Sequence, residues 1–199
     1  MALLLVENFA SEVAKPTYWT LPEIAGRLVE VSGSAASASL TVVFGLVREA
    51  QERREPVGWA TSAERCFYPP DVAAAGVDLA SLVIVRVPKP ESIARAGEKL
   101  LRSGGFGLVV LDLGVGDIPV PLQTRLAGLT RHHHTALVCL TTKEDQAFSL
   151  SSLISLRLHA EKKRAVDNRF ACGLRALKDK HRGPTWNYQE LCHGAAGLC

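Results

Sequence analysis

The sequence has no hydrophobic run long enough to cross a membrane, and we expect no leader that would direct secretion. A membrane-spanning helix needs about 20 consecutive apolar residues, whereas the opening MALLLVENFA turns polar at Glu7. This opening is also too short for a signal peptide and lacks the basic residues that begin one. The sequence therefore predicts a soluble, cytoplasmic protein with no membrane partner.

The arrangement of the cysteines disfavours two common stabilising devices, disulfide frameworks and zinc sites. The cysteines are odd in number, lie far apart and form no C-x-x-C pair, so neither a disulfide framework nor a zinc site is expected. Cys139 and Cys172 lie within apolar runs and are predicted to be buried small hydrophobic residues. The full set is Cys66, Cys139, Cys172, Cys192 and Cys199.

Motifs for nucleophilic or metal catalysis are missing as well. The chain contains neither a Gly-x-Ser-x-Gly elbow nor a His-Glu-x-x-His pair. The histidines at 132–134 are consecutive, so they do not share a helix face as metal ligands four residues apart would. At the end of a helix, where positive charge is favoured, they need no metal. We expect no catalytic residue and no metal site.

The chain also carries only a small net charge. The formal net charge is +3 and 22% of the residues are charged, whereas nucleic-acid-binding proteins usually carry far denser basic patches. The most basic segment, residues 159–183, is therefore interpreted as a solvated face, with an anionic partner as the alternative. The 199 residues, 47% of them hydrophobic, suffice for one sizeable core rather than two.

What the sequence does contain is an alternation of apolar strands and helices. Such strands imply an α/β fold with a mostly parallel central sheet flanked by helices. After about residue 150 the apolar period changes to two, which predicts antiparallel strands added at the C-terminal edge. Strands are predicted at 27–31, 56–61, 106–114 and 135–142 and within 79–87, and helices at 40–55, 69–76, 90–105 and 121–133.

Four segments, in this order, resemble the ATPase core of the RecA family of recombinases. They are LPEIAGRLVEVSG, FYPPDVAAAGVDLASLVIVR, FGLVVLDL and GLRALKDKHRGPTWNYQELCHGAAGL. The resemblance implies a RecA-like core at residues 22–199, preceded by an N-terminal extension at 1–21. The pair AAGVDLASLVIVR and LLRSGGFGLVVLDL more closely resembles the ImuA-type proteins, bacterial accessory factors of damage-induced (SOS) mutagenesis. Those proteins work beside a Y-family-like polymerase homologue, ImuB, and a specialised replicative-type polymerase.

The phosphate loop of this family is incomplete in the chain. The motif G-x-x-x-x-G-K-[ST] uses glycines to wrap phosphates, a lysine to neutralise them and a hydroxyl to bind magnesium. Gly33 matches the first glycine, whereas Ala38, Ser39 and Leu40 stand at the second glycine, lysine and hydroxyl positions. The sequence therefore predicts a loop without nucleotide, no cofactor and no enzyme activity.

Other positions of the family's ATP site are retained. Glu64 matches the glutamate that orients the attacking water, and Asp112 matches the aspartate that supports magnesium through water. Lys178 and Lys180 match lysines that reach a neighbour's ATP in a filament. The resemblance implies remnants of ATP hydrolysis. Because the loop lacks its lysine and hydroxyl, we favour a simpler interpretation. Glu64 is then a solvated loop charge, Asp112 caps a turn at the strand end, and the two lysines lie on the hairpin surface.

The two DNA-binding loops of the family correspond to residues 114–121 and 143–152, and both are short. The second carries two acidic residues against one lysine, and only Phe148 could stack on a base. DNA binding in the RecA manner is therefore not expected. The alternative is weak attraction to a phosphate backbone. It would come from the basic residues Lys162, Lys163, Arg164, Lys178, Lys180 and Arg182.

These features predict a non-catalytic RecA-like adaptor in the DNA damage response and translesion synthesis, which binds RecA or an ImuB-like polymerase subunit. Two alternatives stay open: a DNA-binding recombination mediator that uses the basic carboxyl-terminal hairpin, and a weak ATPase with an altered loop. The extension at 1–21 is predicted either to pack on a neighbouring subunit, giving self-association, or to cover this chain's own sheet edge.

Overall fold

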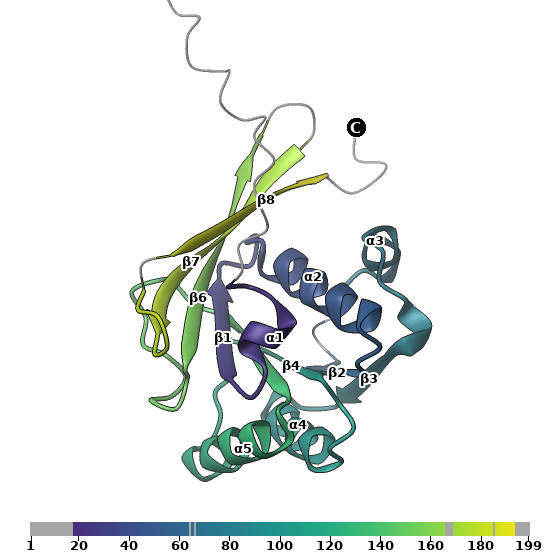
Figure 1. The fold of residues 1–199 in the computed structure, drawn as a ribbon, viewed down its shortest axis with the longest axis vertical. Coiled ribbons are helices and arrows are strands. Elements are labelled where there is room, and N and C mark those ends of the chain that lie inside the picture. The colour runs from purple at the N-terminus through teal and green to yellow at the C-terminus, as the bar shows by residue number, and fades with distance from the viewer. Residues whose placement is uncertain (1–17, 64, 66, 166–168, 185, 194–199) are drawn as a thin grey trace, which may run out of the picture.

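The computed structural model describes residues 18–63, 65, 67–165, 169–184 and 186–193, which build one central sheet with helices on both faces (Figure 1). The eight strands follow the order β3-β2-β4-β5-β1-β6-β7-β8. They are β1 (Leu28–Gly33), β2 (Val57–Ser62), β3 (Leu82–Val87), β4 (Leu108–Gly114), β5 (Ala136–Thr142), β6 (Leu156–Arg164), β7 (Arg169–Asp179) and β8 (Asn187–His193).

The sheet is parallel from β3 to β6 and antiparallel beyond it. Strand β1 pairs in parallel with both β5 and β6, whereas β7 runs antiparallel to β6 and β8 antiparallel to β7. Parallel strands need crossover connections. Helices lie in the crossovers from β1 through to β5, the loop 143–155 joins β5 to β6, and β6, β7 and β8 follow one another without a helix. The structure therefore confirms the predicted α/β class, with a RecA-like mostly parallel sheet and antiparallel strands at its C-terminal edge.

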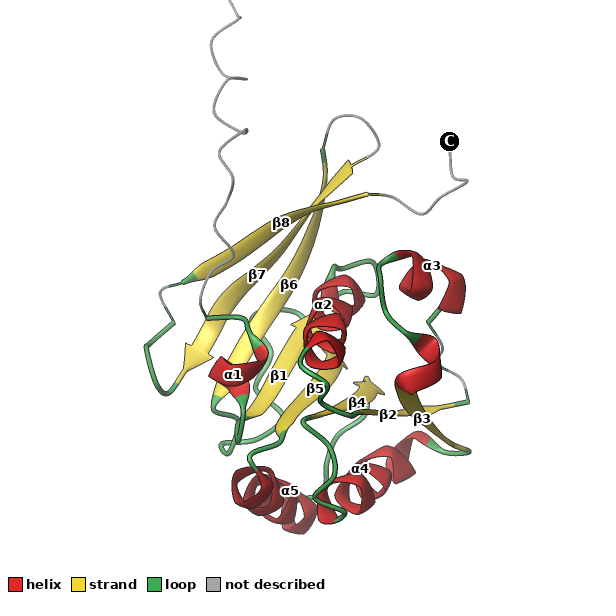
Figure 2. Cartoon of the chain, turned by 45° about the vertical axis from the view of Figure 1, so that its right-hand side comes forward, coloured by secondary structure: helices red, strands yellow, loops and turns green. Residues whose placement is uncertain are grey.

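The helices lie in two layers, one on each face of the sheet (Figure 2). Val43 and Val47 of α2 pack with Val31 and Trp59 in one apolar core, to which α1 and α3 also contribute. On the opposite face, α4 and α5 pack in a second core that includes Leu111. The helices are α1 (Leu21–Ile24), α2 (Ser39–Glu52), α3 (Pro69–Ala74), α4 (Ile93–Arg102) and α5 (Val120–His133).

Short 3-10 turns precede one predicted strand and the start of one predicted helix. The strand predicted within 79–87 occupies Leu82–Val87, since the Asp78 carboxylate accepts a hydrogen bond from the Ala80 N–H at 2.9 Å and holds a turn there. The helix predicted at 90–105 begins at Ile93, after a turn opened by Pro90. Both turns are of types that local hydrogen bonding and proline geometry favour.

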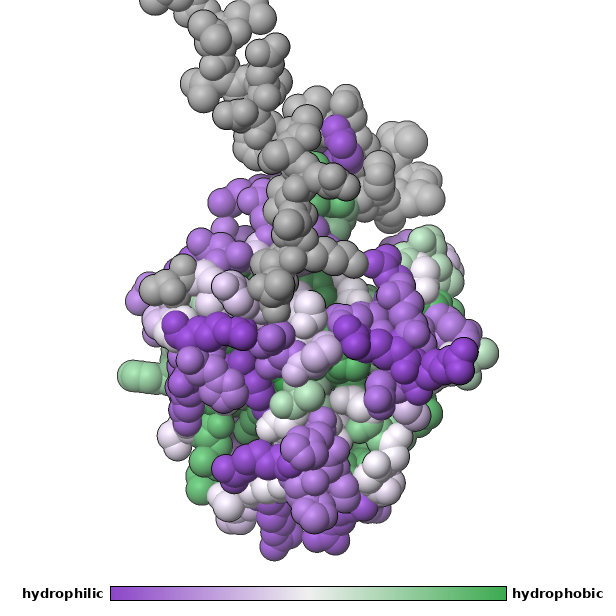
Figure 3. All heavy atoms as spheres, in the orientation of Figure 1, coloured by the Kyte–Doolittle hydropathy of each residue, from purple (hydrophilic) through white to green (hydrophobic). Residues whose placement is uncertain are grey.

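The outer surface is mixed in character. Hydrophilic residues dominate the face shown in Figure 3, with smaller hydrophobic patches between them. Among the helices that the structure describes, none is long and apolar enough to span a bilayer. A cytoplasmic location stays a prediction.

Candidate functional site

The loop between β1 and α2 lies where the parallel strands end, the usual ligand position in open α/β sheets. It is tightly curled on itself. The Ser37 N–H donates to the Ser34 carbonyl at 3.1 Å, and the Ser37 hydroxyl donates to the Ser39 hydroxyl at 3.1 Å. The Ser39 N–H, at the start of α2, lies 3.4 Å from the Ser37 Oγ. The loop's polar groups are thus directed at one another.

Gly33 is required by this packing. A Cβ atom there would lie 2.4 Å from the Ser37 Oγ and 3.0 Å from the Ala160 carbonyl oxygen, so a larger residue would push the loop away. Ala38 is buried in the core, whereas Leu40 faces solvent at the first turn of α2. The structure thus places all four predicted loop positions around one turn, with an apolar side chain where the family has its hydroxyl.

The space beside this loop is small. A pocket of about 50 Å³ is lined by the loop serines, Arg65 and the end of β5. One water occupies about 30 Å³ in the liquid, and small-molecule sites usually reach about 300 Å³ or more. In this conformation the pocket has about the volume of one or two waters.

Asp112 is held by a partner that the sequence reasoning missed. Its Oδ1 lies 2.7 Å from the Arg65 Nε, and its Oδ2 lies 3.3 Å from the Thr61 Oγ1. The Asp112 side chain is buried, whereas Arg65 is partly exposed. The carboxylate expected either to support magnesium or to cap a turn is therefore neutralised by a guanidinium of its own chain.

Gly114 makes room for this ion pair. It follows a register shift between β4 and β5 and has a left-handed φ of 59°, which favours glycine. A Cβ atom there would lie 2.6 Å from the Arg65 Nη1. A glycine two residues after the strand-end aspartate was the sequence signal that a side chain passes close to the backbone here. Glu64, the other predicted remnant, lies outside the described residues.

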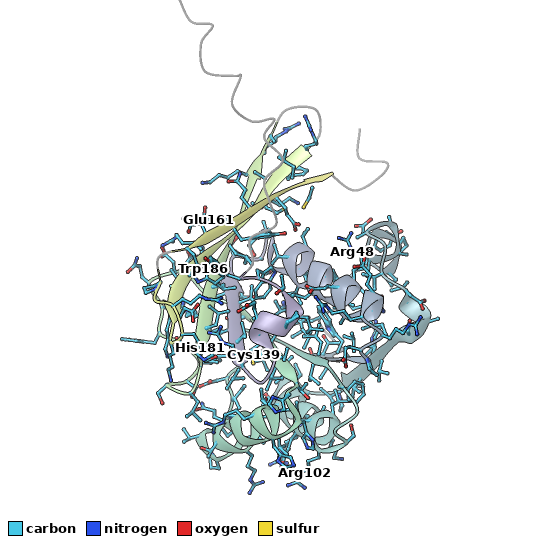
Figure 4. All side chains as sticks on the ribbon, in the orientation of Figure 1. Arg48, Arg102, Cys139, Glu161, His181 and Trp186 are labelled. Carbon is cyan, nitrogen blue, oxygen red and sulfur yellow. The ribbon has the colours of Figure 1, made fainter. Side chains whose placement is uncertain are left out.

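The predicted basic group is divided by the structure between the two ends of the β6–β7 hairpin. Arg164 pairs with Phe170 at one end, and Arg157 pairs with Lys178 at the other. At about 3.4 Å per residue the two ends lie roughly 24 Å apart. In Figure 4, Glu161 and His181 mark these two regions. The six residues therefore do not form one surface.

The basic residues at the lower end are engaged within the chain. The Lys180 Nζ donates to the Ser152 carbonyl at 2.7 Å, and Arg182 pairs with Glu23 at 2.8 Å while stacking over the Tyr18 ring. Lys178 is partly buried, and its pKa is lowered first by desolvation and then by the charge of Lys180. At the other end, Lys162 lies over the Phe170 ring and Lys163 pairs with Glu161.

A buried carboxylate, also missed by the sequence reasoning, organises the loop after β5. The Glu30 Oε1 accepts from the Thr141 hydroxyl at 3.1 Å and from the Lys143 Nζ at 3.3 Å. Its Oε2 accepts from the Leu150 N–H at 2.9 Å, and the Arg157 Nε lies 3.9 Å away. A charged residue inside an otherwise apolar strand was the available signal, because burial of such a group demands partners.

A second hollow, much larger, lies between α4 and the edge strand β3. It encloses about 610 Å³ and is mainly apolar, with basic residues on its rim. Gly58 of β2 leaves room for Leu100, one of its lining side chains, since a Cβ atom at Gly58 would lie 3.1 Å from the Leu100 Cδ1. Val83 and Ile84 of the same edge strand are exposed. The lining residues are Val85, Ser92, Arg95, Ala96, Lys99, Leu100, Ser103 and Phe106.

Among the described residues, no three His, Cys, Asp or Glu side chains converge in a way that could hold a metal ion. His133 ends α5 and His134 caps it with a left-handed φ of 54°. The rings of His132 and His133 meet edge to face, with centroids 4.7 Å apart.

Comparison with known proteins finds similarity to RecA and no matching family model. The chain is 31% identical over 113 residues to RecA of Picosynechococcus sp., an alignment that covers 51% of this chain and 32% of that protein. RecA of Clostridium acetobutylicum gives the same identity and coverage, and RecA of Acholeplasma laidlawii is 29% identical over 112 residues, covering 56% and 33%.

The alignments thus span about a third of each RecA and about half of this chain. The closer resemblance to ImuA-type proteins stays a prediction. The parallel sheet with its C-terminal antiparallel strands, taken with these similarities, supports placing the chain in the RecA-like superfamily.

Proposed function

We propose that this protein is a non-catalytic RecA-like adaptor in the DNA damage response and translesion synthesis, acting through contact with RecA or an ImuB-like polymerase subunit. The observation that carries the non-catalytic part is the Arg65–Asp112 ion pair beside the small serine-lined pocket. RecA similarity supports a role in DNA repair or recombination.

Nucleotide binding at this position would be unfavourable for several reasons. Loss of the loop lysine removes a charge pairing of about 4 kcal/mol at contact in a partly screened site. Leu40 offers no oxygen to magnesium. A magnesium ion near Asp112 would also have to displace Arg65, whose guanidinium already satisfies the carboxylate at 2.7 Å. The site is therefore proposed to be structural.

The protein-binding part is supported by the edge of the sheet at β3. An edge strand leaves one row of backbone N–H and C=O groups unpaired, and an extended segment of another protein can add to it. Beside this edge lies the apolar hollow against α4, rimmed by Arg95 and Lys99. The combination suits an extended segment with apolar side chains and at least one acidic residue.

The N-terminal extension is one candidate for such a segment. Residues 1–17 lie outside the described part of the chain. Trp19 is buried against α2, its Nε1 donating to the Val42 carbonyl at 3.3 Å, and the Tyr18 ring lies 5.8 Å from that of Trp186. The end of the extension thus covers this chain's own fold, and packing of the remainder on a neighbour stays a prediction.

The nucleotide part is tested by thermal unfolding with ATP and magnesium, with RecA measured in parallel as a positive control. A ligand that binds only the folded state raises the melting temperature by mass action. We expect no rise for this protein at millimolar ATP. A clear rise, or ATP hydrolysis above a heat-inactivated sample, would favour the weak-ATPase alternative.

The adaptor part is tested by biolayer interferometry with purified RecA and the ImuB-like subunit from the same organism. We expect one of them to bind. The double variant Arg95→Glu/Lys99→Glu should weaken that binding by about tenfold or more, because it reverses the charge of the groove rim. Lys163→Glu changes charge at the distant hairpin and is the control. Failure of the wild-type chain to bind either protein would reject the adaptor.

A DNA-binding mediator is the second candidate, and one observation favours it. Lys162, Lys163 and Arg164 gather on β6 at the outer end of the hairpin, where all three are exposed. Fluorescence anisotropy with an oligonucleotide at several salt concentrations tests it. If the mediator is correct, alanine at these three positions lowers both affinity and salt slope, whereas Lys178→Ala/Lys180→Ala at the other end does not.

A further inference from the structure

Two loops at the carboxyl ends of β4 and β5 display apolar side chains to solvent. Residues 115–119 follow β4, and residues 143–155 follow β5. Val115 in the first loop, Val120 at the start of α5 and Phe148 in the second loop retain 87%, 72% and 93% of their full exposure. These three residues, together with Asp117 of the first loop and Glu144 of the second, are called here the loop face.

The two loops are joined to each other by one side chain. Gln123, from the first turns of α5, donates from its Nε2 to the Ile118 carbonyl at 2.6 Å and to the Leu150 carbonyl at 3.2 Å. Its side chain is buried, as are Ile118 and Leu150. The loops therefore lie side by side over a common apolar base.

The second loop is also fixed from beneath by charged groups. Lys143, anchored on Glu30, donates to the Phe148 carbonyl at 3.4 Å. Arg157 donates to the Ala147 carbonyl and, at 3.2 Å, to the Glu144 carbonyl. These bonds hold the backbone on both sides of Phe148. A loop held in this way loses little further freedom when it binds, which favours affinity.

The remaining charge on the loop face is negative. Lys143 is paired with Glu30 and Asp145 with Arg175 at 2.7 Å. Within the described residues the structure records no ion pair for Asp117 or Glu144. Two carboxylates on the loops that carry the exposed Phe148 ring repel a phosphate backbone and attract a basic rim.

We propose that the loop face is a docking surface for a partner protein, with Phe148 entering an apolar pocket rimmed by lysine or arginine. Aromatic side chains in preorganised settings supply much of the energy of protein interfaces, whereas charges at the rim select the partner. The inference rests on the proposed adaptor function and gives it a second surface, separate from the β3 groove.

The test uses the full chain, purified RecA and ImuB-like subunit, and a fluorescein-labelled oligo(dT). Phe148→Ser removes the anchor, and Asp117→Lys/Glu144→Lys reverses the rim. Leu191→Ser, at a half-exposed position on β8, is the matched control for loss of an exposed apolar side chain. Melting temperatures confirm that each variant is folded.

We expect both loop-face variants to weaken binding of the protein partner by about tenfold or more, and the control to leave it unchanged. Unchanged partner affinity in both variants would overturn the inference while leaving the adaptor proposal intact. Absence of any binding by the wild-type chain would reject both. If oligo(dT) binds the wild type, is lost with Phe148→Ser and binds more tightly after charge reversal, the loop face is a single-stranded DNA site instead.

Discussion

Arg27 and Asp179 are 152 residues apart in the sequence and form a buried ion pair, with 2.7 Å between the Arg27 Nη2 and the Asp179 Oδ1. Arg27 also donates to the Ser155 Oγ and carbonyl, both at 3.2 Å. Asp179 accepts from the Trp186 Nε1 at 3.0 Å, in the region labelled in Figure 4. This pair joins the start of β1 to the end of β7.

Removing one member of this ion pair should lower the free energy of unfolding substantially. Asp179→Asn leaves the Arg27 guanidinium buried without its counter-charge, and such changes cost about 3–5 kcal/mol of unfolding free energy. Urea unfolding followed by tryptophan fluorescence measures the loss. Arg182→Ala removes an ion pair whose two side chains are both about a third exposed, together with the contact on the Tyr18 ring, so it should cost only about 1–2 kcal/mol. Similar losses for the two variants would contradict the assignment.

The Asp179 carboxylate should also make the free energy of unfolding depend on pH. Burial raises the pKa of Asp179, but hydrogen bonds from the His181 N–H, Trp186 and Arg27 outweigh it, so the pKa lies below its ordinary value of 3.8. The folded state therefore gains stability from ionised Asp179 above that value and loses it as the pH falls through the lower folded pKa.

Urea titrations of the wild type and Asp179→Asn at a series of pH values test this dependence. The difference in unfolding free energy between the wild type and the variant should be largest near neutral pH and should shrink as the pH falls below about 4. Asp145, whose pKa is also lowered, chiefly by Arg175, is unchanged in both proteins and cancels in the comparison. A difference that stays constant down to acid would show that Asp179 titrates normally.

Gly114→Ala should be more damaging than an ordinary substitution at a left-handed position. The backbone alone accounts for roughly 1–2 kcal/mol of the loss, and the new Cβ would meet the Arg65 guanidinium at 2.6 Å. Gly183 has φ 79° with nothing near its missing Cβ, so Gly183→Ala measures the backbone cost alone. In an Arg65→Ala background the excess cost at Gly114 should disappear. If Gly114→Ala still costs more than Gly183→Ala in that background, the Arg65 side chain is not the group that the new Cβ meets.

Glu30→Gln should loosen the loop after β5. The Leu150 N–H donates to the Glu30 carboxylate at 2.9 Å, and a hydrogen bond to a charged group contributes about 1.5–3 kcal/mol. Hydrogen exchange of the Leu150 amide should therefore accelerate about tenfold or more. Glu144→Gln, in the same loop but exposed, is the control. Equal protection in both variants would mean that Glu30 does not hold this loop.

Much of the architecture was predictable from the sequence because it depends on local pattern. Fully apolar runs such as residues 108–111 form buried strands, and each of the parallel strands from β1 to β5 was located within a few residues. The apolar alternation of residues 156–164 and 169–179 indicated the hairpin. The substituted loop positions Ala38, Ser39 and Leu40 were also readable, because the chemistry of a phosphate loop depends on residue type and spacing.

Pairings between distant segments were decided only by the tertiary structure. Arg65 finds Asp112, Glu30 finds Leu150, and Arg27 finds Asp179 because the strand order brings β1, β4 and β7 to particular neighbours. The basic residues of the hairpin, close in sequence to one another, are separated because antiparallel pairing sends them to opposite ends. A sequence shows which groups need partners, since burial of charge is costly, whereas the fold alone determines which partner each group meets.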